Sequence, residues 1–250
     1  MSTDERLVAV ILAAGRGTRM KSDLAKVLHP LAGRPMILHV IDAAEQAGAI
    51  RTLCVVGYQG DRVREVLAGR DNVELTVQEE PLGTGHALEC AGPSLMGFDG
   101  DVLVCCGDTP LLTGELLKTL VDQHRHDDAP ATMLVATLDD PSGYGRVVAD
   151  DDQRVAAIVE EADADSETLS IRRINAGVYC FRWPIVYPLL AELGTSNSQG
   201  ERYLTDVMML LSAAGTPGHL CEAPDPQEIQ GVNDPGQLAM ADAVLRDRAR

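Results

Sequence analysis

The chain has 250 residues and a net charge of −17 at neutral pH, which argues against nucleic-acid binding, because that usually needs a basic face. Its hydrophobic content of 45% is ordinary for a globular protein, and no apolar run approaches the roughly 20 residues of a membrane helix. The N-terminal residues MSTDER lack the basic start of a signal peptide. We therefore expect a cytoplasmic protein without nucleic-acid or membrane partners.

The first predicted element is a buried strand over Leu7–Ala13, and the glycine-rich stretch LAAGRGTRM overlaps its end. Gly15 and Gly17 let the backbone turn tightly and bring its N–H groups close to a ligand. Two of the three lysines of this acidic chain lie nearby, and the local cations are Arg16, Arg19, Lys21 and Lys26. A strand that ends in a cationic glycine turn is suited to receiving a polyphosphate.

Helices and strands then alternate. Helices are predicted over Pro35–Gly48, Asp61–Leu67, His86–Ala91 and Glu115–His124, and strands over Thr52–Val56, Val73–Gln78, Asp101–Cys106 and Ala131–Leu138. This alternation predicts an α/β fold with a mainly parallel sheet covered on both faces. Ligands bind such sheets beyond the carboxyl ends of the strands. The glycine loop, Gln78 with Gly83–Thr84, and Asp108 all follow strands, so we expect them at one edge.

The second half of the chain has a different pattern. The segments PSGYGRVV, VAAIVEE and INAGVYCF predict short strands of an antiparallel lobe folded over the same edge, with an acidic loop at Asp163–Thr168. Helices are predicted over Ile185–Leu193, Tyr203–Ala214 and Gln237–Arg248. No repeat or proline-rich linker divides the chain, which indicates one domain with a small lobe.

The glycine loop alone leaves several interpretations open. A dinucleotide fingerprint needs a third small residue and a later acidic residue for the ribose, and both are missing. The P-loop pattern GxxxxGK[ST] does not occur. A tight turn with solvated arginines is the simplest alternative. The six cysteines have neither CxxC nor zinc spacing, so we expect free thiols, mostly buried.

These motifs together resemble a known family. LAAGRGTRM with SDLAKVLHPLAGRPM is similar to the signature of sugar-phosphate nucleotidyltransferases. QEEPLGTGHA, CCGDTPLL, GYGRVV, IVEEADA, INAGVY, QGERYLTDV and GVND then resemble, in order, the uridylyltransferase domain of bacterial N-acetylglucosamine-1-phosphate uridylyltransferases. The resemblance covers Leu7 to Asp234 and implies a Rossmann-like nucleotidyltransferase fold.

The resemblance implies transfer of UMP from UTP to N-acetylglucosamine 1-phosphate. The products would be UDP-N-acetylglucosamine, a precursor of peptidoglycan and lipopolysaccharide, and pyrophosphate. The implied catalytic residues are Arg19, Lys26 and Asp108, with Mg²⁺ held by Asp108 and Asn233. The implied nucleotide-binding residues are Leu12, Ala13, Ala14, Gly15, Lys26, Gln78, Gly83 and Thr84. The implied sugar-binding residues are Cys106, Gly107, Asp108, Gly145, Glu160, Asn175 and Asn233.

Each residue type has an ordinary structural alternative. Asp108 could cap a helix or form a turn, and Asn233 could be a turn residue. Gln78 could be a polar strand end, and Glu160, beside Glu161, a solvated one. His29 and His86 are expected only to pack or cap locally.

The chain also departs from the family pattern at two positions. Ala25 stands where proline is usual, and Cys106 stands where tyrosine is common. The second departure leaves room for another sugar 1-phosphate. A catalytically silent nucleotide-binding module and an NAD-dependent enzyme are the remaining alternatives.

The last segment, QLAMADAVLRDRAR, resembles the helix that links this domain to a left-handed β-helix in bifunctional members. We therefore expect a nucleotidyltransferase domain over residues 1–235 and a linking helix over residues 236–250. The sequence contains no hexapeptide repeats, so acetyltransferase activity and the trimer built on that β-helix are not carried over. The oligomeric state stays open.

Overall fold

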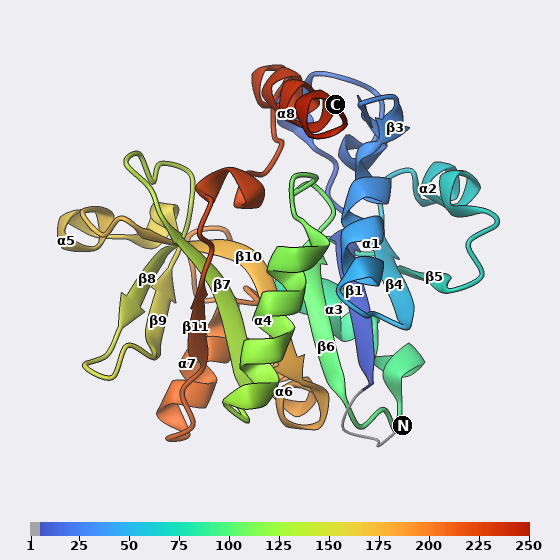
Figure 1. Cartoon of the computed structure of the whole chain (residues 1–250). Coiled ribbons are helices and arrows are strands. Elements are labelled where there is room, and N and C mark those ends of the chain that lie inside the picture. The colour runs from blue at the N-terminus through green and yellow to red at the C-terminus, as the bar shows by residue number, and fades with distance from the viewer. Residues whose placement is uncertain (1–5) are drawn as a thin grey trace.

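The fold is built on one twisted sheet, shown in Figure 1, in a computed structural model that describes residues 6–250. Four parallel strands form one half of the sheet: β1 (Leu7–Ala13), β4 (Arg51–Val56), β5 (Val73–Val77) and β6 (Asp101–Cys106). The strand order is β11-β7-β10-β6-β1-β4-β5. The predicted mainly parallel α/β fold is therefore confirmed.

The other half of the sheet is mixed. β10 (Arg173–Arg182) lies antiparallel between β6 and β7 (Ala131–Thr137), and β11 (His219–Glu222) runs parallel to β7. β8 (Arg146–Ala149) and β9 (Val155–Val159) form an antiparallel pair that joins the sheet through β10. This pair is the small antiparallel lobe at the side of the molecule (Figure 1).

Helices cover both faces because the strand residues alternate between two cores. Leu7, Ala9 and Ile11 of β1 face the core beneath α1 (Met36–Gln46), α2 (Gly60–Leu67) and α4 (Gly114–His126). Val8 and Val10 face the opposite core, which is closed by α3 (Thr84–Cys90), α6 (Trp183–Leu190) and α7 (Asp206–Ala213). The sheet is thus buried on both sides, as crossover connections require.

A third, smaller core lies above the carboxyl edge of the parallel strands. Helix α8 (Pro235–Arg248) packs there against β2 (Pro30–Leu31), which pairs with β3 (Arg34–Pro35). Figure 1 shows α8 at the same end of the molecule as the loop that follows β6. The last helix of the chain therefore lies at the end of the sheet where ligands are expected.

Several predicted elements differ from the structure. The INAGVYCF segment is not a lobe strand: β10 lies mainly in the central sheet, and only Ile174 pairs with the lobe. The expected loop at Asp163–Thr168 is partly helical, because the Asp165 side chain caps α5 (Ser166–Leu169) through the backbone N–H of Thr168.

The last predicted helices are shifted by a few residues. Pro184 starts α6 at Trp183 rather than at Ile185, because proline suits the first turn of a helix. Helix α7 begins three positions later than the predicted Tyr203, at Asp206. The short strands β2, β3 and β11 were not predicted.

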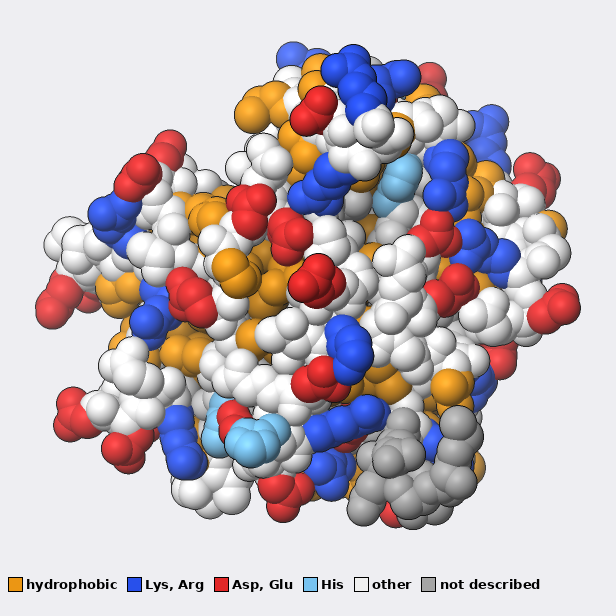
Figure 2. Space-filling view, viewed as in Figure 1, with side chains coloured by type: hydrophobic (Ala, Val, Ile, Leu, Met, Phe, Trp, Pro, Cys, Tyr) orange, Lys and Arg blue, Asp and Glu red, His pale blue; other side chains and the backbone are white. Residues whose placement is uncertain are grey.

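The surface is dominated by acidic side chains. Figure 2 shows Asp and Glu spread over the visible face, and Lys and Arg both at the end where α8 lies and at several other places, including the opposite end. Within residues 6–250, no helix combines the length and the apolar character needed to cross a bilayer. All six cysteines are free thiols, as expected, and four of them are buried.

Candidate functional site

The glycine loop after β1 is held against the short helical turn Lys26–Leu28. Gly17 has a φ of 68°, and a Cβ atom there would lie 2.6 Å from the Cβ of Lys26. A larger residue would therefore push the Lys26 backbone away from the loop. Arg16 instead lies over the ring of Tyr58, with its Cζ 5.1 Å from the ring centroid. Of the local cations, Arg16 is thus stacked on an aromatic ring, whereas Lys26 packs against Gly17 of the loop.

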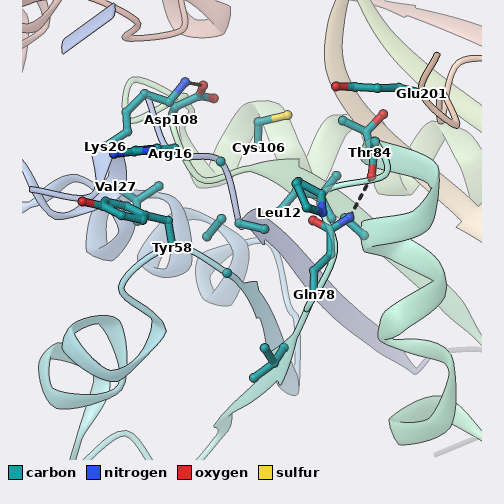
Figure 3. A pocket seen from close by; sticks show the side chains of 18 of the residues that line it. Leu12, Arg16, Lys26, Val27, Tyr58, Gln78, Thr84, Cys106, Asp108 and Glu201 are labelled. Carbon is teal, nitrogen blue, oxygen red and sulfur yellow. Dashed lines mark hydrogen bonds and ion pairs between the residues drawn. The ribbon is translucent and has the colours of Figure 1, made fainter. Parts of the chain in front are cut away.

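A cavity of about 490 Å³ opens at the carboxyl edge of the sheet, within the range typical of small-molecule sites. Figure 3 shows Gln78 and Thr84 on one side of it and Lys26 and Asp108 on the other. Every predicted nucleotide-binding residue lines it: Leu12, Ala13, Ala14, Gly15, Lys26, Gln78, Gly83 and Thr84. The structure therefore brings the three separate loop regions together at one site.

One wall of the cavity is formed by the end of β5 and the start of α3. Gln78 is 7% exposed, and its Nε2 donates to the carbonyl oxygen of Gly83 at 3.0 Å. Gly83 has a φ of 111°, and a Cβ atom there would lie 2.6 Å from the backbone oxygen of Arg202. The Thr84 hydroxyl accepts a hydrogen bond from the backbone of Leu204. This wall is consequently fixed by backbone contacts between distant segments.

A cluster of polar side chains lies at the opposite wall. The Lys26 Nζ donates to a carboxylate oxygen of Asp108 and, at 3.0 Å, to the side-chain oxygen of Asn233. Arg19 donates to the same oxygen of Asn233 at 2.9 Å. Two cations and two oxygen ligands from three distant segments therefore converge. Lys26 and Asp108 also line the cavity, so the cluster lies at its rim.

The backbone explains why these residues meet. The N–H of Gly107 donates to the oxygen of Leu12, which holds the loop after β6 beside the loop after β1. The N–H of Val232 donates to the backbone oxygen of Asp108 at 2.8 Å. Asp108 caps no helix, since the N-cap of α4 is Thr113. The position of Asp108 is thus set by its neighbours at the sheet edge.

The remaining predicted sugar-binding residues form a second group, in and beside the lobe. A Cβ atom on Gly145 would lie 3.3 Å from both carboxylate oxygens of Glu160, and the Asn175 N–H donates to the Gly145 oxygen at 2.9 Å. Among the described residues, the lining of the large cavity includes Cys106 and Asp108 but none of these three. Burial, followed by the charges of Asp163 and Asp206, raises the pKa of Glu160. Glu160 is therefore a half-buried carboxylate rather than a solvated strand end.

Cys106 connects the two groups. Its thiol donates to the carbonyl oxygen of Gly177 at 3.6 Å, next to an irregularity in β10 between Asn175 and Tyr179. The side-chain oxygen of Asn175 accepts from both the Gly177 N–H and the Tyr179 hydroxyl. Burial, followed by the charge of Asp108, raises the pKa of the Cys106 thiol to about 12. Cys106 is consequently a neutral hydrogen-bond donor at this position.

Several residues at the site were not assigned to it by the sequence analysis, and three of them are polar or aromatic. Tyr58 and Glu201 line the cavity, and the His86 Nδ1 lies 3.0 Å from the Gln78 Nε2. Tyr58 follows a strand in VVGYQG, a position at which a sheet-edge argument could have found it. His86 packs locally, as expected, and the residue that it contacts is Gln78, a predicted nucleotide-binding residue.

The oxygen pair of Asp108 and Asn233 suits a hard divalent cation. Carboxylate and amide oxygens are ligands that Mg²⁺ accepts, and Mg²⁺ commonly uses only one or two protein ligands. Both oxygens lie within hydrogen-bond reach of the single Nζ atom of Lys26, so they already face a common point. Among residues 6–250, no group of three or more His, Cys, Asp or Glu side chains is arranged to hold a metal.

Comparisons with known proteins agree with this geometry. Residues 9–202 match the model of the MobA-like NTP transferase domain. The chain is 48% identical over 244 residues to the bifunctional protein GlmU of Pelobacter propionicus, and 45% identical over 240 residues to that of Geobacillus thermodenitrificans. These matches cover 98% and 96% of this chain but only 53% and 52% of the relatives. The chain thus spans about half the length of these relatives.

The fold has solved counterparts as well. A UDP-glucose pyrophosphorylase complexed with UDP-glucose superposes with a TM-score of 0.78 at 16% identity, covering 97% of this chain and 99% of that one. At this identity the likeness supports the fold alone. The family model, in contrast, covers most of the chain. The chain therefore belongs to the family of MobA-like NTP transferase domains.

Proposed function

We propose that this protein transfers UMP from UTP to N-acetylglucosamine 1-phosphate and so makes UDP-N-acetylglucosamine and pyrophosphate with Mg²⁺. The observation that carries the proposal is the convergence of Lys26, Asp108 and Asn233 at the rim of the cavity that the glycine loop and Gln78 line. The GlmU relatives support the choice of this reaction. Nucleotide and sugar-phosphate substrates also agree with the motifs in the sequence.

The reaction needs charge stabilisation more than acid–base chemistry. A phosphate oxygen of the sugar phosphate forms a bond to the α-phosphorus of UTP. The bond from this phosphorus to the bridging oxygen of the β-phosphate breaks, and pyrophosphate leaves with the electron pair. The attacking phosphate is largely ionised near neutral pH, since its second pKa is about 6. The site therefore requires no general base, but it must bring two polyanions together.

Lys26 and Arg19 are suited to that task. Both are cations at the rim of the cavity, where they can neutralise the triphosphate and the charge that develops on the leaving pyrophosphate. Asp108 and Asn233 would hold Mg²⁺, which on binding polarises the phosphoryl oxygens and shields their charge. The backbone N–H groups of the glycine loop add fixed donors for phosphate oxygens.

We expect one end of the site to bind the base and the other end to bind the sugar. Gln78, Gly83 and Thr84 would bind the uracil end, because an amide and nearby backbone groups can complement the edge of a base. Glu160 and Asn175 would bind sugar hydroxyls or the acetamido group, and Gly145 allows close approach of the backbone. Cys106 lines the cavity and contacts Gly177 beside Asn175, so it would lie between these two ends.

The test is pyrophosphate release by the purified protein over a panel of nucleotides and sugar 1-phosphates. We expect turnover with UTP, N-acetylglucosamine 1-phosphate and Mg²⁺, and much less with other pairs. Turnover with UTP and a different sugar 1-phosphate would instead identify a sibling uridylyltransferase. UTP binding without turnover would identify a silent binding module and contradict the proposal.

A further inference from the structure

The buried amide of Gln78 has an unusual arrangement of partners. Its nitrogen donates one hydrogen to the Gly83 oxygen, and its other hydrogen faces the His86 Nδ1; both distances are 3.0 Å. An amide nitrogen carries only two hydrogens, so both are used within the protein. The amide oxygen is left, and Figure 3 shows it on the cavity side of the group.

The tautomer of His86 follows from the same contacts. The Gly83 carbonyl can only accept, so it fixes the nitrogen of the Gln78 amide on the side of Gly83 and His86. The Nδ1 of His86 must then accept, and the imidazole proton lies on Nε2. His86 and Cys90 lie one turn apart on α3, and the His86 Nε2 is 3.7 Å from the Cys90 sulfur, a weak acceptor. Gln78 thus donates a hydrogen bond to His86, and His86 in turn donates to Cys90.

This arrangement determines what the cavity offers to a base. The Gln78 oxygen is an acceptor, and it can pair with the N3–H of uracil. Cytosine has an acceptor at the same ring position, so the two lone pairs would face each other. A rotated amide would offer an N–H to cytosine, but it would place its oxygen against the Gly83 oxygen and the His86 Nδ1. The Gly83 oxygen opposes that rotation directly. His86 opposes it while its proton stays on Nε2, where it faces the Cys90 sulfur.

We propose that His86 is a positioning residue that, together with the Gly83 oxygen, holds the amide of Gln78 as an acceptor and thereby helps the site to select uracil over cytosine. This inference rests on the proposed function, because it concerns the base end of the same site. His86 need not touch the nucleotide, since it acts through Gln78. Its alternative role is purely structural: it would then satisfy a buried amide without affecting the choice of base.

The experiment compares three variants with the wild-type protein. His86→Leu removes the acceptor, His86→Asn keeps an oxygen near the position of Nδ1, and His126→Leu makes the same change at the exposed end of α4. For each protein, kcat and KM are measured with UTP and with CTP. Dissociation constants for the two nucleotides are measured by calorimetry, and thermal unfolding gives the stability.

We expect His86→Leu to lower the preference for UTP over CTP by about tenfold or more in kcat/KM and in the ratio of dissociation constants. The loss appears mainly as a higher KM for UTP. His86→Asn restores most of the preference, and His126→Leu keeps the wild-type ratio. An unchanged ratio in His86→Leu, with or without a lower unfolding temperature, would overturn the inference while the proposed function stands. A wild-type protein without UTP turnover would overturn both.

Discussion

Asp108 and Asn233 share one hydrogen-bond donor, the Nζ atom of Lys26. The segments that carry them are also joined directly, since the Val232 N–H donates to the backbone oxygen of Asp108. One residue follows a central strand and the other precedes the last helix, so only the folded chain creates the pair. This relationship links the fold to the proposed metal chemistry.

Replacing Asp108 with alanine should remove nearly all activity and preserve the fold. The carboxylate is the charged member of the proposed metal pair, and its loss removes charge stabilisation worth several kcal/mol, or about 1,000-fold in kcat. Pyrophosphate release measures the activity, and circular dichroism with thermal unfolding measures the fold. Turnover within a few-fold of the wild-type rate would refute the assignment of Asp108 to the metal.

Lys26→Met should reduce kcat by about 100- to 1,000-fold, because a preorganised cation at the phosphates is lost. Lys118 offers a matched control. It lies exposed on α4, where it pairs across one helical turn with Asp122. Lys118→Met should leave the kinetics unchanged within about twofold. If both variants lost activity equally, the loss in Lys26→Met could not be assigned to a cation at the phosphate site.

Glu160→Gln should stabilise the protein at pH 7 and weaken sugar-phosphate binding. Burial and two acidic neighbours raise the pKa of Glu160, so its ionised form costs stability at neutral pH. That cost disappears as the pH falls through the raised folded-state pKa, and the difference from wild type should shrink there. Urea unfolding at several pH values tests whether the variant is the more stable protein at pH 7 and whether the difference in unfolding free energy shrinks at lower pH.

The same variant should raise the KM for the sugar phosphate about tenfold, because a charge-assisted hydrogen bond is lost. An unchanged KM would remove Glu160 from the sugar site, even if the variant were more stable.

Asp101→Asn should destabilise the fold by about 3 kcal/mol at pH 7, because it breaks a buried ion-pair network far from the cavity. Asp101 is 1% exposed and pairs with Arg125 at 2.7 Å. Burial alone would raise its pKa, but His124 and Arg125 outweigh burial and lower the pKa below its usual value.

The pH dependence of this effect has a definite sign. A lowered folded-state pKa gives stability that is present above the unfolded value, about 3.9, and is lost as the pH falls through the folded-state pKa. The difference between wild type and Asp101→Asn should therefore be full at pH 6 and shrink toward pH 3. A difference that grew on acidification would contradict the network.

The sequence predicted the parallel half of the sheet well because most of its strands are nearly continuous apolar runs and β5 alternates regularly. Leu7–Ala13 and Asp101–Cys106 are buried on both faces, and such runs are hard to mistake. β11 has four residues and no periodicity, so its strand form depends on pairing with β7. The place of β10 between two central strands likewise depends on partners that its own residues do not reveal.

The residues of the site also differ in whether a local sequence pattern predicts them. Glycine, lysine and aspartate after strands predict a phosphate site at a sheet edge, because the topology brings strand ends together. Asn233 carries no such local signal, and only the resemblance to a known family pointed to it. The contact of His86 with Gln78 depends on the rotation of α3 against the end of β5, which a sequence pattern does not specify.

The most direct test of the central claim is to incubate the purified protein with UTP, N-acetylglucosamine 1-phosphate and Mg²⁺ and to quantify both products. The account predicts equal amounts of UDP-N-acetylglucosamine and pyrophosphate, with no formation of either in excess EDTA and about 1,000-fold slower formation by Asp108→Ala. UTP binding without either product, or product formation by Asp108→Ala within a few-fold of the wild-type rate, would contradict it.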